Sequence, residues 1–350
     1  MRLTLTAAAD PAIAGFDTVI DVRSPAEYAD DHLPGAINLP VLDDAERARV
    51  GTVYKQVSPF DARKLGAALV AANAARHISG PLADKPGGWR PLVYCWRGGM
   101  RSGSFGVILA QIGWRVQVIE GGYKSWRRLV NQRVEQLGIE APLIVLDGNT
   151  GSAKTAILRR LAARGAQVLD LEGLANHRGS LFGAMPGGQP SQRLFEGRLA
   201  TAIEALDPAR PVLVEAESSK IGNLVLPRAI WRGLCAAPRI RLEVPVAARA
   251  GYSARDYADA VVEPGRVEAI LDRLRPLHPA ARIEGWHGMV TRGEWVALAE
   301  SLMRDHYDPR YDKHRARYAP REVATVVLDS LDDLDLAASR VEAVLAGLRG

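Results

Sequence analysis

Short apolar runs alternate with amphipathic segments in the first part of the chain. The apolar runs end at polar positions and predict buried strands over residues 17–23, 91–95 and 115–120. Residues 24–33 predict a short helix with Ser24 as its N-cap and Glu27 in the capping-box position. A longer helix is predicted over 123–138. Alternating strands and helices are typical of a parallel α/β domain.

A second α/β pattern begins where an apolar strand, residues 143–147, runs into a glycine-rich turn. A helical pattern over 156–165 follows this turn and ends at a glycine. Further strands are predicted over 166–171, 211–217 and 239–246. After about residue 250 the pattern turns helical, with helices predicted over 265–277, 293–307 and 331–348.

Length and composition indicate two globular domains. A chain of 350 residues exceeds what one core usually serves, and the boundary is placed between 131 and 141, giving domains at 1–135 and 141–350. No apolar run approaches the ~20 residues that a membrane span requires. Two cysteines make no disulfide framework or metal pattern, so we expect a cytoplasmic protein with free thiols and no bound metal. The net charge of +5 permits a polyanionic partner.

Cys95 lies where a predicted strand gives way to a helix, with the loop "WRGGMRS" between them. The positive end of that helix and the charges of Arg97 and Arg101 favour a thiolate over a thiol. The glycine pair at 98–99 permits a tight anion-binding turn, and Ser102 is placed to donate to the sulfur. These neighbours favour a reactive Cys95 over a buried structural one. Cys235 lacks them and is interpreted as structural.

The segment Gly148–Thr155, "GNTGSAKT", follows the P-loop pattern GxxxxGK[ST] except that Ala153 replaces the second glycine. It follows a strand and opens a helix, as a phosphate-binding loop does. Backbone N–H groups would hold phosphates and Lys154 would add a charge, while Thr155 is the residue type that binds a metal ion there. The predicted phosphate-binding residues are Gly148, Gly151, Ser152, Lys154 and Thr155.

Polar residues follow the next two strands of the second pattern. Glu172, His177 and Arg178 come after the strand at 166–171, and Glu217 ends the strand at 211–217. Ligands of open α/β sheets bind at the carboxyl ends of the strands. These four residues are therefore candidates for substrate binding, with an ordinary polar strand end as the alternative for Glu217.

Several segments carry family resemblances. Residues 21–40, 94–102 and 120–126 resemble a rhodanese domain, except that five residues separate Cys95 from Arg101, as in phosphatases of the same fold. With the segments 46–56, 170–183, 217–223 and 307–311, the chain over 17–320 resembles the bacterial tRNA 2-selenouridine synthase family. This implies an α/β fold: a rhodanese-like domain with a parallel sheet, then a P-loop NTPase-like domain with a helical C-terminal part.

The resemblance also implies a transferase reaction on tRNA. In this family the sulfur of the wobble 2-thiouridine is first geranylated from geranyl diphosphate, and selenium from selenophosphate then replaces it. The phosphate loop would bind the diphosphate of the prenyl donor. Cys95 would carry selenium as a selenylated cysteine, with Arg97, Arg101 and Ser102 assisting. No tightly bound cofactor is implied, and Mg²⁺ is left open as an accompanying ion.

The tRNA would need a basic surface. Candidate cations are Arg159, Arg160, Arg164, Arg310, Lys313, Arg315, Arg317 and Arg321. Two alternatives remain open from the residues alone. One is a rhodanese-fold phosphatase or sulfurtransferase fused to a small-molecule kinase, and the other is a non-catalytic RNA-binding or regulatory module whose loops sense anions.

Overall fold

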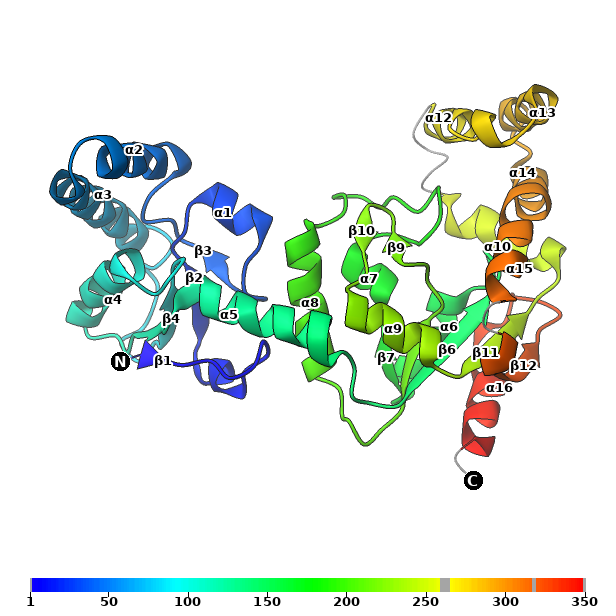
Figure 1. The fold of residues 1–350 in the computed structure, drawn as a ribbon, viewed down its shortest axis with the longest axis horizontal. Coiled ribbons are helices and arrows are strands. Elements are labelled where there is room, and N and C mark those ends of the chain that lie inside the picture. Colours follow the sequence, from blue (N-terminus) through cyan, green and yellow to red (C-terminus); the bar gives the residue numbers. More distant parts are fainter. Residues whose placement is uncertain (1, 259–264, 317–318, 349–350) are drawn as a thin grey trace. The chain divides into compact units, whose positions relative to one another are not determined.

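The computed structural model describes residues 2–258, 265–316 and 319–348, and the chain divides into two compact units (Figure 1). The first unit comprises Met1–Leu137 and Ser191–Ala205. The second comprises Gly138–Pro190 and Leu206–Gly350. The predicted boundary between 131 and 141 falls where the first unit passes into the second. The return of 191–205 to the first unit has no counterpart in the sequence prediction.

A five-stranded sheet with the order β1-β5-β4-β2-β3 forms the centre of the first unit. Every neighbouring pair in it is parallel. The strands predicted over 17–23, 91–95 and 115–120 are its central members β2, β4 and β5. The bounds are β1 Arg2–Leu3, β2 Thr18–Asp21, β3 Ile37–Asn38, β4 Pro91–Tyr94 and β5 Gln117–Ile119.

Helices surround this sheet. The capping box predicted at Ser24 and Glu27 is present at the start of α1. Helices α3 and α4 pack together, and their side chains Val70, Phe105 and Leu109 join strand residues in a buried core. The helices are η1 Pro11–Gly15, α1 Pro25–Asp30, α2 Asp44–Gln56, α3 Pro59–Ser79, α4 Met100–Ile112, α5 Gly122–Asn131 and the π-helix η2 Gln132–Leu137.

Helix α8 (Gln192–Glu204) completes the first unit, although it follows the phosphate loop in the sequence. It packs against α5 and η2. Gly197 permits the close approach, because a Cβ atom there would lie 2.7 Å from the Trp126 ring. Arg127 on α5 forms an ion pair with Glu196, and Arg133 on η2 forms one with Glu204.

The second unit has its own five-stranded parallel sheet, in the order β12-β11-β6-β8-β7. Strand β6, which leads into the phosphate loop, lies in the middle, and the next two predicted strands are β7 and β8 on one side of it. A separate antiparallel pair joins β9 and β10. The bounds are β6 Leu143–Gly148, β7 Gln167–Leu169, β8 Val212–Glu215, β9 Lys220–Ile221, β10 Leu224–Val225, β11 Arg239–Glu243 and β12 Glu322–Val327.

Strand β12 corrects the prediction that the chain is helical after residue 250. It pairs in parallel with β11 at the edge of the sheet. Its side chains alternate between exposed and partly buried positions except at Val326, which is buried. A short edge strand offers little apolar periodicity, so the helical segments on either side of it dominated the pattern.

Helices α6 and α16 share a large apolar core with the sheet, which includes Leu158, Leu161, Val341 and Leu345. A smaller core forms among α12, α13 and α14 around Trp286. The predicted helix 265–277 ends in a 3-10 turn, η3. The predicted helix 293–307 ends in a π-helical turn, η4. The helices are α6 Lys154–Ala163, α7 Leu171–Ala175, α9 Arg228–Ala236, α10 Val246–Asp256, α12 Arg266–Asp272, η3 Arg275–Leu277, α13 Ala280–Thr291, α14 Trp295–Leu302, η4 Met303–Tyr307, α15 Asp308–Arg315, η5 Ala319–Arg321 and α16 Leu334–Gly347.

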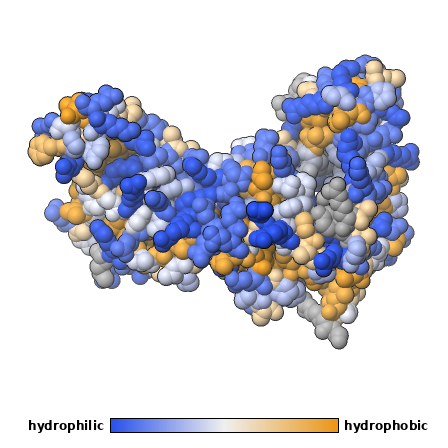
Figure 2. All heavy atoms as spheres, viewed as in Figure 1, coloured by the Kyte–Doolittle hydropathy of each residue, from blue (hydrophilic) through white to orange (hydrophobic). Residues whose placement is uncertain are grey.

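Hydrophilic side chains cover most of the face drawn in Figure 2, and apolar side chains form smaller patches between them. Among the residues that the structure describes, no helix has the length and apolar character needed to cross a membrane. The two parallel sheets with their covering helices confirm the predicted α/β fold class.

Candidate functional site

Cys95 directly follows β4, at the entrance of the loop that leads to α4. Only 3% of its surface is exposed. Ser102, in the first turn of α4, is fully buried and donates a hydrogen bond from its hydroxyl to the Cys95 sulfur over 3.1 Å. The sulfur therefore lies against the positive end of a helix of 13 residues.

The turn before α5 supports the cysteine loop through its backbone. Tyr123 donates its N–H to the Cys95 carbonyl over 2.8 Å, and Lys124 donates to the Trp96 carbonyl over 3.0 Å. Gly122 has a φ of +60°, and a Cβ atom on it would lie 2.2 Å from the Cys95 carbonyl oxygen. The glycine pair in "EGGYKSW" thus permits this turn to approach the loop closely enough to bond it.

Two further contacts hold Tyr123 in place. The Arg23 guanidinium stacks over the Tyr123 ring at 4.0 Å from its centroid, and Arg23 is itself paired with Asp21 in the protein interior. The Tyr123 hydroxyl donates to Asp31, which is fully buried. Burial raises the pKa of Asp31, although Tyr123 and Arg127 oppose the shift. Side chains of the rhodanese-like segment at 21–40 therefore hold Tyr123, and the backbone of Tyr123 supports the cysteine loop.

The two arginines of the loop have different surroundings. Arg101 forms an ion pair with Glu27 at 2.9 Å, so a carboxylate compensates its charge. Burial raises the pKa of Glu27, but hydrogen bonding and attraction from Arg101 outweigh it and hold the pKa below its usual value. Arg97 is exposed and lines a groove of about 1210 Å³ together with Trp96. Other cations of this groove are Lys124, Arg127, Arg128 and Arg193.

In the second unit, the phosphate loop joins β6 to α6 as predicted. Gly151 has a φ of +80°, and Ala153 has a φ of +58°. The alanine thus takes the left-handed conformation that glycine would supply, at a cost on the order of 1–2 kcal/mol. The left-handed turn before α6 is therefore retained with alanine in place of glycine.

Polar groups of the loop are held in defined positions. Lys154 donates from Nζ to the Gly148 carbonyl over 2.8 Å, and Nζ lies 5.9 Å from the centroid of the Tyr311 ring. Thr155 donates its hydroxyl to Glu172 over 2.7 Å. The Ser152 hydroxyl is buried and has no hydrogen-bond partner within the part of the chain that the structure describes.

The structure brings the candidate residues of the second unit together. Glu172, His177, Arg178 and Glu217 line one cavity of about 130 Å³ with residues 150–156 of the phosphate loop. His177 is 8% exposed, and burial lowers its pKa. The segment 172–178 and Glu217, which are distant in the sequence, thus line one cavity with the phosphate loop.

Two carboxyl groups lie next to each other in this cavity. A Cβ atom on Gly179 would lie 2.5 Å from a Glu172 oxygen and 2.6 Å from a Glu217 oxygen. Burial and then repulsion from Glu172 and Glu215 raise the pKa of Glu217 well above its usual value. Burial also raises the pKa of Glu172, although Thr155 and Lys154 oppose the shift. The pair favours a shared proton or a bound cation.

The oxygen atoms of Thr155, Glu172 and Glu217 are the hard ligands that Mg²⁺ prefers, so these residues fit the ion that the sequence left open. Among the described residues, no group of three or more His, Cys, Asp or Glu side chains is arranged to hold a metal. A Mg²⁺ ion here would therefore depend on phosphate oxygens or water for its other ligands.

Sequence reasoning missed the residues that brace the phosphate loop from outside. Arg249 on α10 donates to the Thr150 carbonyl over 3.1 Å and forms an ion pair with Asp308 at 2.7 Å. Asn149 also donates to Asp308, over 2.9 Å. Asp308 and Tyr311 lie in the segment 307–311, whose family resemblance is the local sequence signal for this contact.

Glu215 lies at the end of β8 and is fully buried. Its carboxylate accepts the Glu172 N–H over 2.8 Å. Burial, followed by repulsion from Asp170, raises the pKa of Glu215 to about 8. From about pH 4.5 to 8 the folded chain keeps a proton that the unfolded chain has lost, so stability falls as pH rises through this window.

We expect Glu215→Gln to reduce this loss, because glutamine keeps the acceptor and stays neutral at every pH. Above pH 8 the variant should exceed the wild type in stability by about 1 kcal/mol or more. Urea-unfolding midpoints at pH 5, 7 and 9 measure the difference. Equal pH slopes for both proteins would show that Glu215 is ionised throughout.

The two units define a class of protein: a rhodanese-like domain with a loop cysteine, joined to a P-loop domain with an acidic phosphate cavity. Residues 5–129 match the model of the rhodanese-like domain. Residues 141–269 match the model of the tRNA 2-selenouridine synthase AAA domain. These matches confirm the predicted order of the two domain types.

Full-length relatives extend the match. The chain is 34% identical over 336 residues to the tRNA 2-selenouridine synthase of Alcanivorax borkumensis, covering 86% of this chain and 90% of the relative. It is 34% identical over 337 residues to the enzyme of the same name from Chromohalobacter salexigens, covering 88% and 90%. The chain belongs to the tRNA 2-selenouridine synthase family.

Among solved structures, a rhodanese-related protein from Thermoplasma volcanium is 21% identical and has a TM-score of 0.23. The match covers 36% of this chain and 92% of that protein.

Proposed function

We propose that this protein is a transferase that replaces the sulfur of the wobble 2-thiouridine in tRNA with selenium. Geranyl diphosphate and selenophosphate are its proposed small substrates. The observation that carries the proposal is the convergence of Lys154, Thr155, Glu172, Arg178 and Glu217 on one cavity at the phosphate loop. The names of the relatives support tRNA as the modified substrate.

In the first proposed step the 2-thiouridine sulfur attacks C1 of geranyl diphosphate. A carbon–sulfur bond forms, the carbon–oxygen bond breaks, its electron pair leaves with pyrophosphate, and the base loses its N3 proton. Lys154 and the N–H groups of the phosphate loop would stabilise the charge that grows on the leaving group. A Mg²⁺ ion, when bound by Thr155, Glu172 and Glu217, would supply further positive charge.

In the second proposed step selenium from selenophosphate replaces the sulfur at C2, and geranylthiol leaves. Water cleaves the phosphorus–selenium bond to give phosphate. A selenylated Cys95 would need a two-electron oxidant that selenophosphate does not supply. Cys95 is therefore proposed to give a proton to the departing geranylthiolate, with Ser102 as hydrogen-bond donor to the Cys95 sulfur. Arg97 and Arg101 are the proposed cations for the selenophosphate anion. To bind it, Arg101 would give up part of its ion pair with Glu27 and pair with the selenophosphate instead.

The basic surface for tRNA is proposed to include the groove beside Cys95. Arg97, Lys124 and Arg128 are exposed there. By contrast, the arginines expected from the sequence on α6 and at its C-terminal end are ion-paired. Arg159 pairs with Asp170, Arg160 with Asp335, and Arg164 with both Asp335 and Glu342. Of the candidates near the C-terminus, Arg317 lies outside the described residues.

One reaction mixture tests the proposal: purified protein, tRNA containing 2-thiouridine, geranyl diphosphate and Mg²⁺, with nucleosides measured by mass spectrometry. We expect the S-geranyl nucleoside and pyrophosphate, and conversion to 2-selenouridine after selenophosphate is added. Unchanged 2-thiouridine in both stages rejects the proposal. Phosphate release from an aryl phosphate that disappears in Cys95→Ala would favour the phosphatase alternative instead.

A further inference from the structure

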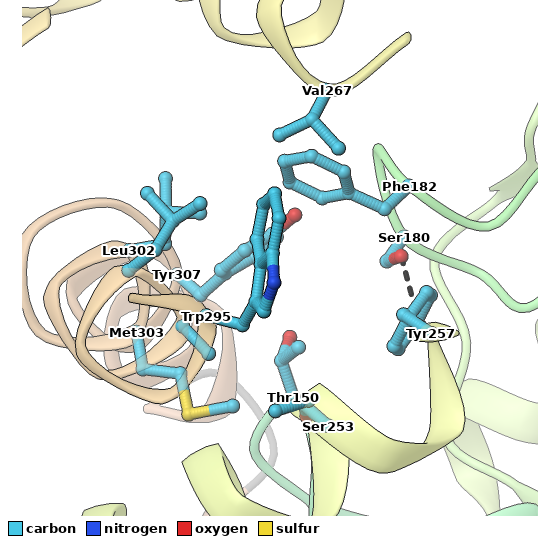
Figure 3. Close-up of a pocket in the computed structure, with 13 residues that line it drawn as sticks. Thr150, Ser180, Phe182, Ser253, Tyr257, Val267, Trp295, Leu302, Met303 and Tyr307 are labelled. Atoms are coloured by element: carbon cyan, nitrogen blue, oxygen red, sulfur yellow. Dashed lines mark hydrogen bonds between the residues drawn. The ribbon is translucent and has the colours of Figure 1, made fainter. Parts of the chain in front are cut away.

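An apolar cavity of about 80 Å³ lies next to the phosphate cavity in the second unit (Figure 3). The two cavities share three lining residues, Thr150, Ser180 and Tyr257. The Ser180 and Tyr257 hydroxyls are hydrogen-bonded to each other over 3.0 Å. The other polar side-chain groups of the lining are the Thr150, Ser253 and Tyr307 hydroxyls and the Trp295 N–H, and the remaining side chains are apolar. Its other lining residues are Phe182, Ser253, Ala254, Val267, Trp295, Leu298, Ala299, Leu302, Met303 and Tyr307.

The lining of the apolar cavity comes from elements that also form the small helical core of this unit. Leu298 and Leu302 on α14 and Val267 on α12 are buried members of that core. Phe182 and Trp295 pack against it from the side of the cavity, and Figure 3 shows both rings turned into the same space. A well-packed core thus fixes the walls of the cavity.

The phosphate loop itself touches the wall of the apolar cavity. A Cβ atom on Gly151 would lie 2.5 Å from the Ser253 hydroxyl and 2.7 Å from Cε of Met303. Thr150, the residue before Gly151, lines both cavities. A ligand whose phosphate lies on the loop would therefore have the apolar space within reach of its next few atoms.

We infer that the apolar cavity binds the isoprenoid chain of a prenyl diphosphate whose diphosphate lies on the phosphate loop. This inference rests on the proposed function for the identity of the head group. An aromatic base of a nucleotide would bring several polar edge atoms, and the apolar walls offer them few partners. A hydrocarbon chain requires none, and its transfer from water is favourable by ~0.8 kcal/mol for each buried CH₂ group.

Ala299 is the residue to change, because it lines the cavity from α14 and is not fully buried. Ala299→Phe would fill the space with a ring. The matched control is Val296→Phe, which places the same side chain on the same helix at an exposed position. The complementary variant is Leu302→Ala, which enlarges the cavity.

Calorimetric titration with inorganic pyrophosphate, dimethylallyl, geranyl and farnesyl diphosphates and ATP tests the inference on the full-length protein. The wild type should bind geranyl diphosphate at least about tenfold more tightly than pyrophosphate. Ala299→Phe should lose that advantage while its affinity for pyrophosphate is unchanged, and Val296→Phe should keep it. Leu302→Ala should shift the preference toward farnesyl diphosphate.

Equal affinity of the wild type for geranyl diphosphate and pyrophosphate would overturn the inference, and so would preferential binding of ATP. Equal behaviour of Ala299→Phe and Val296→Phe would do the same. If geranyl transfer to tRNA occurs and its rate is the same in Ala299→Phe as in the wild type, the inference fails and the proposed function stands. If geranyl diphosphate binds in the cavity but is never transferred to tRNA, the proposed function fails and the inference stands.

Discussion

Lys154→Ala is expected to lower geranyl transfer to tRNA by a factor of about 100 or more. Lys154 is the cation that lies within the phosphate loop, and its Nζ is already held at the Gly148 carbonyl. Removing one preorganised group that stabilises charge in a transition state typically costs a factor of about 10²–10³ in rate. The S-geranyl nucleoside and released pyrophosphate, measured under single-turnover conditions, report the loss.

The matched control for Lys154→Ala is Arg232→Ala, which removes an exposed cation from α9 of the same unit. We expect this control to retain the wild-type rate. When pre-geranylated tRNA is supplied, Lys154→Ala should also produce 2-selenouridine normally, because the prenyl donor is then bypassed. A Lys154→Ala protein that geranylates tRNA at the wild-type rate would place the diphosphate elsewhere.

Cys95→Ala is expected to abolish 2-selenouridine formation and to leave geranyl transfer largely intact. The loop cysteine lies in the first unit, whereas the phosphate cavity lies entirely in the second. Nucleosides from cells carrying the variant should therefore accumulate the S-geranyl form. Ser102→Ala should give a smaller loss of selenouridine, because it removes the hydroxyl that donates to the sulfur but keeps the sulfur itself.

Cys235→Ala provides the control for Cys95→Ala, since Cys235 is the chain's other cysteine and is only partly buried. Its selenouridine content should equal that of the wild type. Full selenouridine formation by Cys95→Ala would contradict the proposed role of Cys95 in the second step. Loss of both the geranylated and the selenated nucleoside would indicate instead that the change disrupts the fold of the first unit.

Most strands could be predicted from the sequence because their apolar character is local. The central strands of both sheets are continuous runs of buried residues, as in β4 and β8, whose four residues each are all buried. Strand β12 was not predicted, because an edge strand is half exposed and therefore lacks a continuous apolar run. A local pattern can predict at most that α8 is helical. It cannot predict that α8 belongs to the first unit, because this depends on contacts with α5 and η2.

The candidate site divides in the same way. The phosphate loop and the cysteine loop are each continuous segments, so their residue types and spacing are visible in the sequence. Arg249 and Asp308 brace the phosphate loop from positions far along the chain, and their roles arise only from the fold. The pairing of Arg101 with Glu27 likewise joins two segments that the sequence keeps apart.

By itself, the sequence determined the α/β class, the order of the two loops and the family resemblance, because each depends on residues that are near neighbours in the chain. The tertiary structure decided which of these residues share a cavity. It placed Glu172 beside Glu217 and brought the backbone of Tyr123 to the Cys95 loop. It also placed apolar side chains from α12 and α14 in one cavity with Thr150 of the phosphate loop. Cavities of this kind arise where packed elements meet, and no local pattern records their shape.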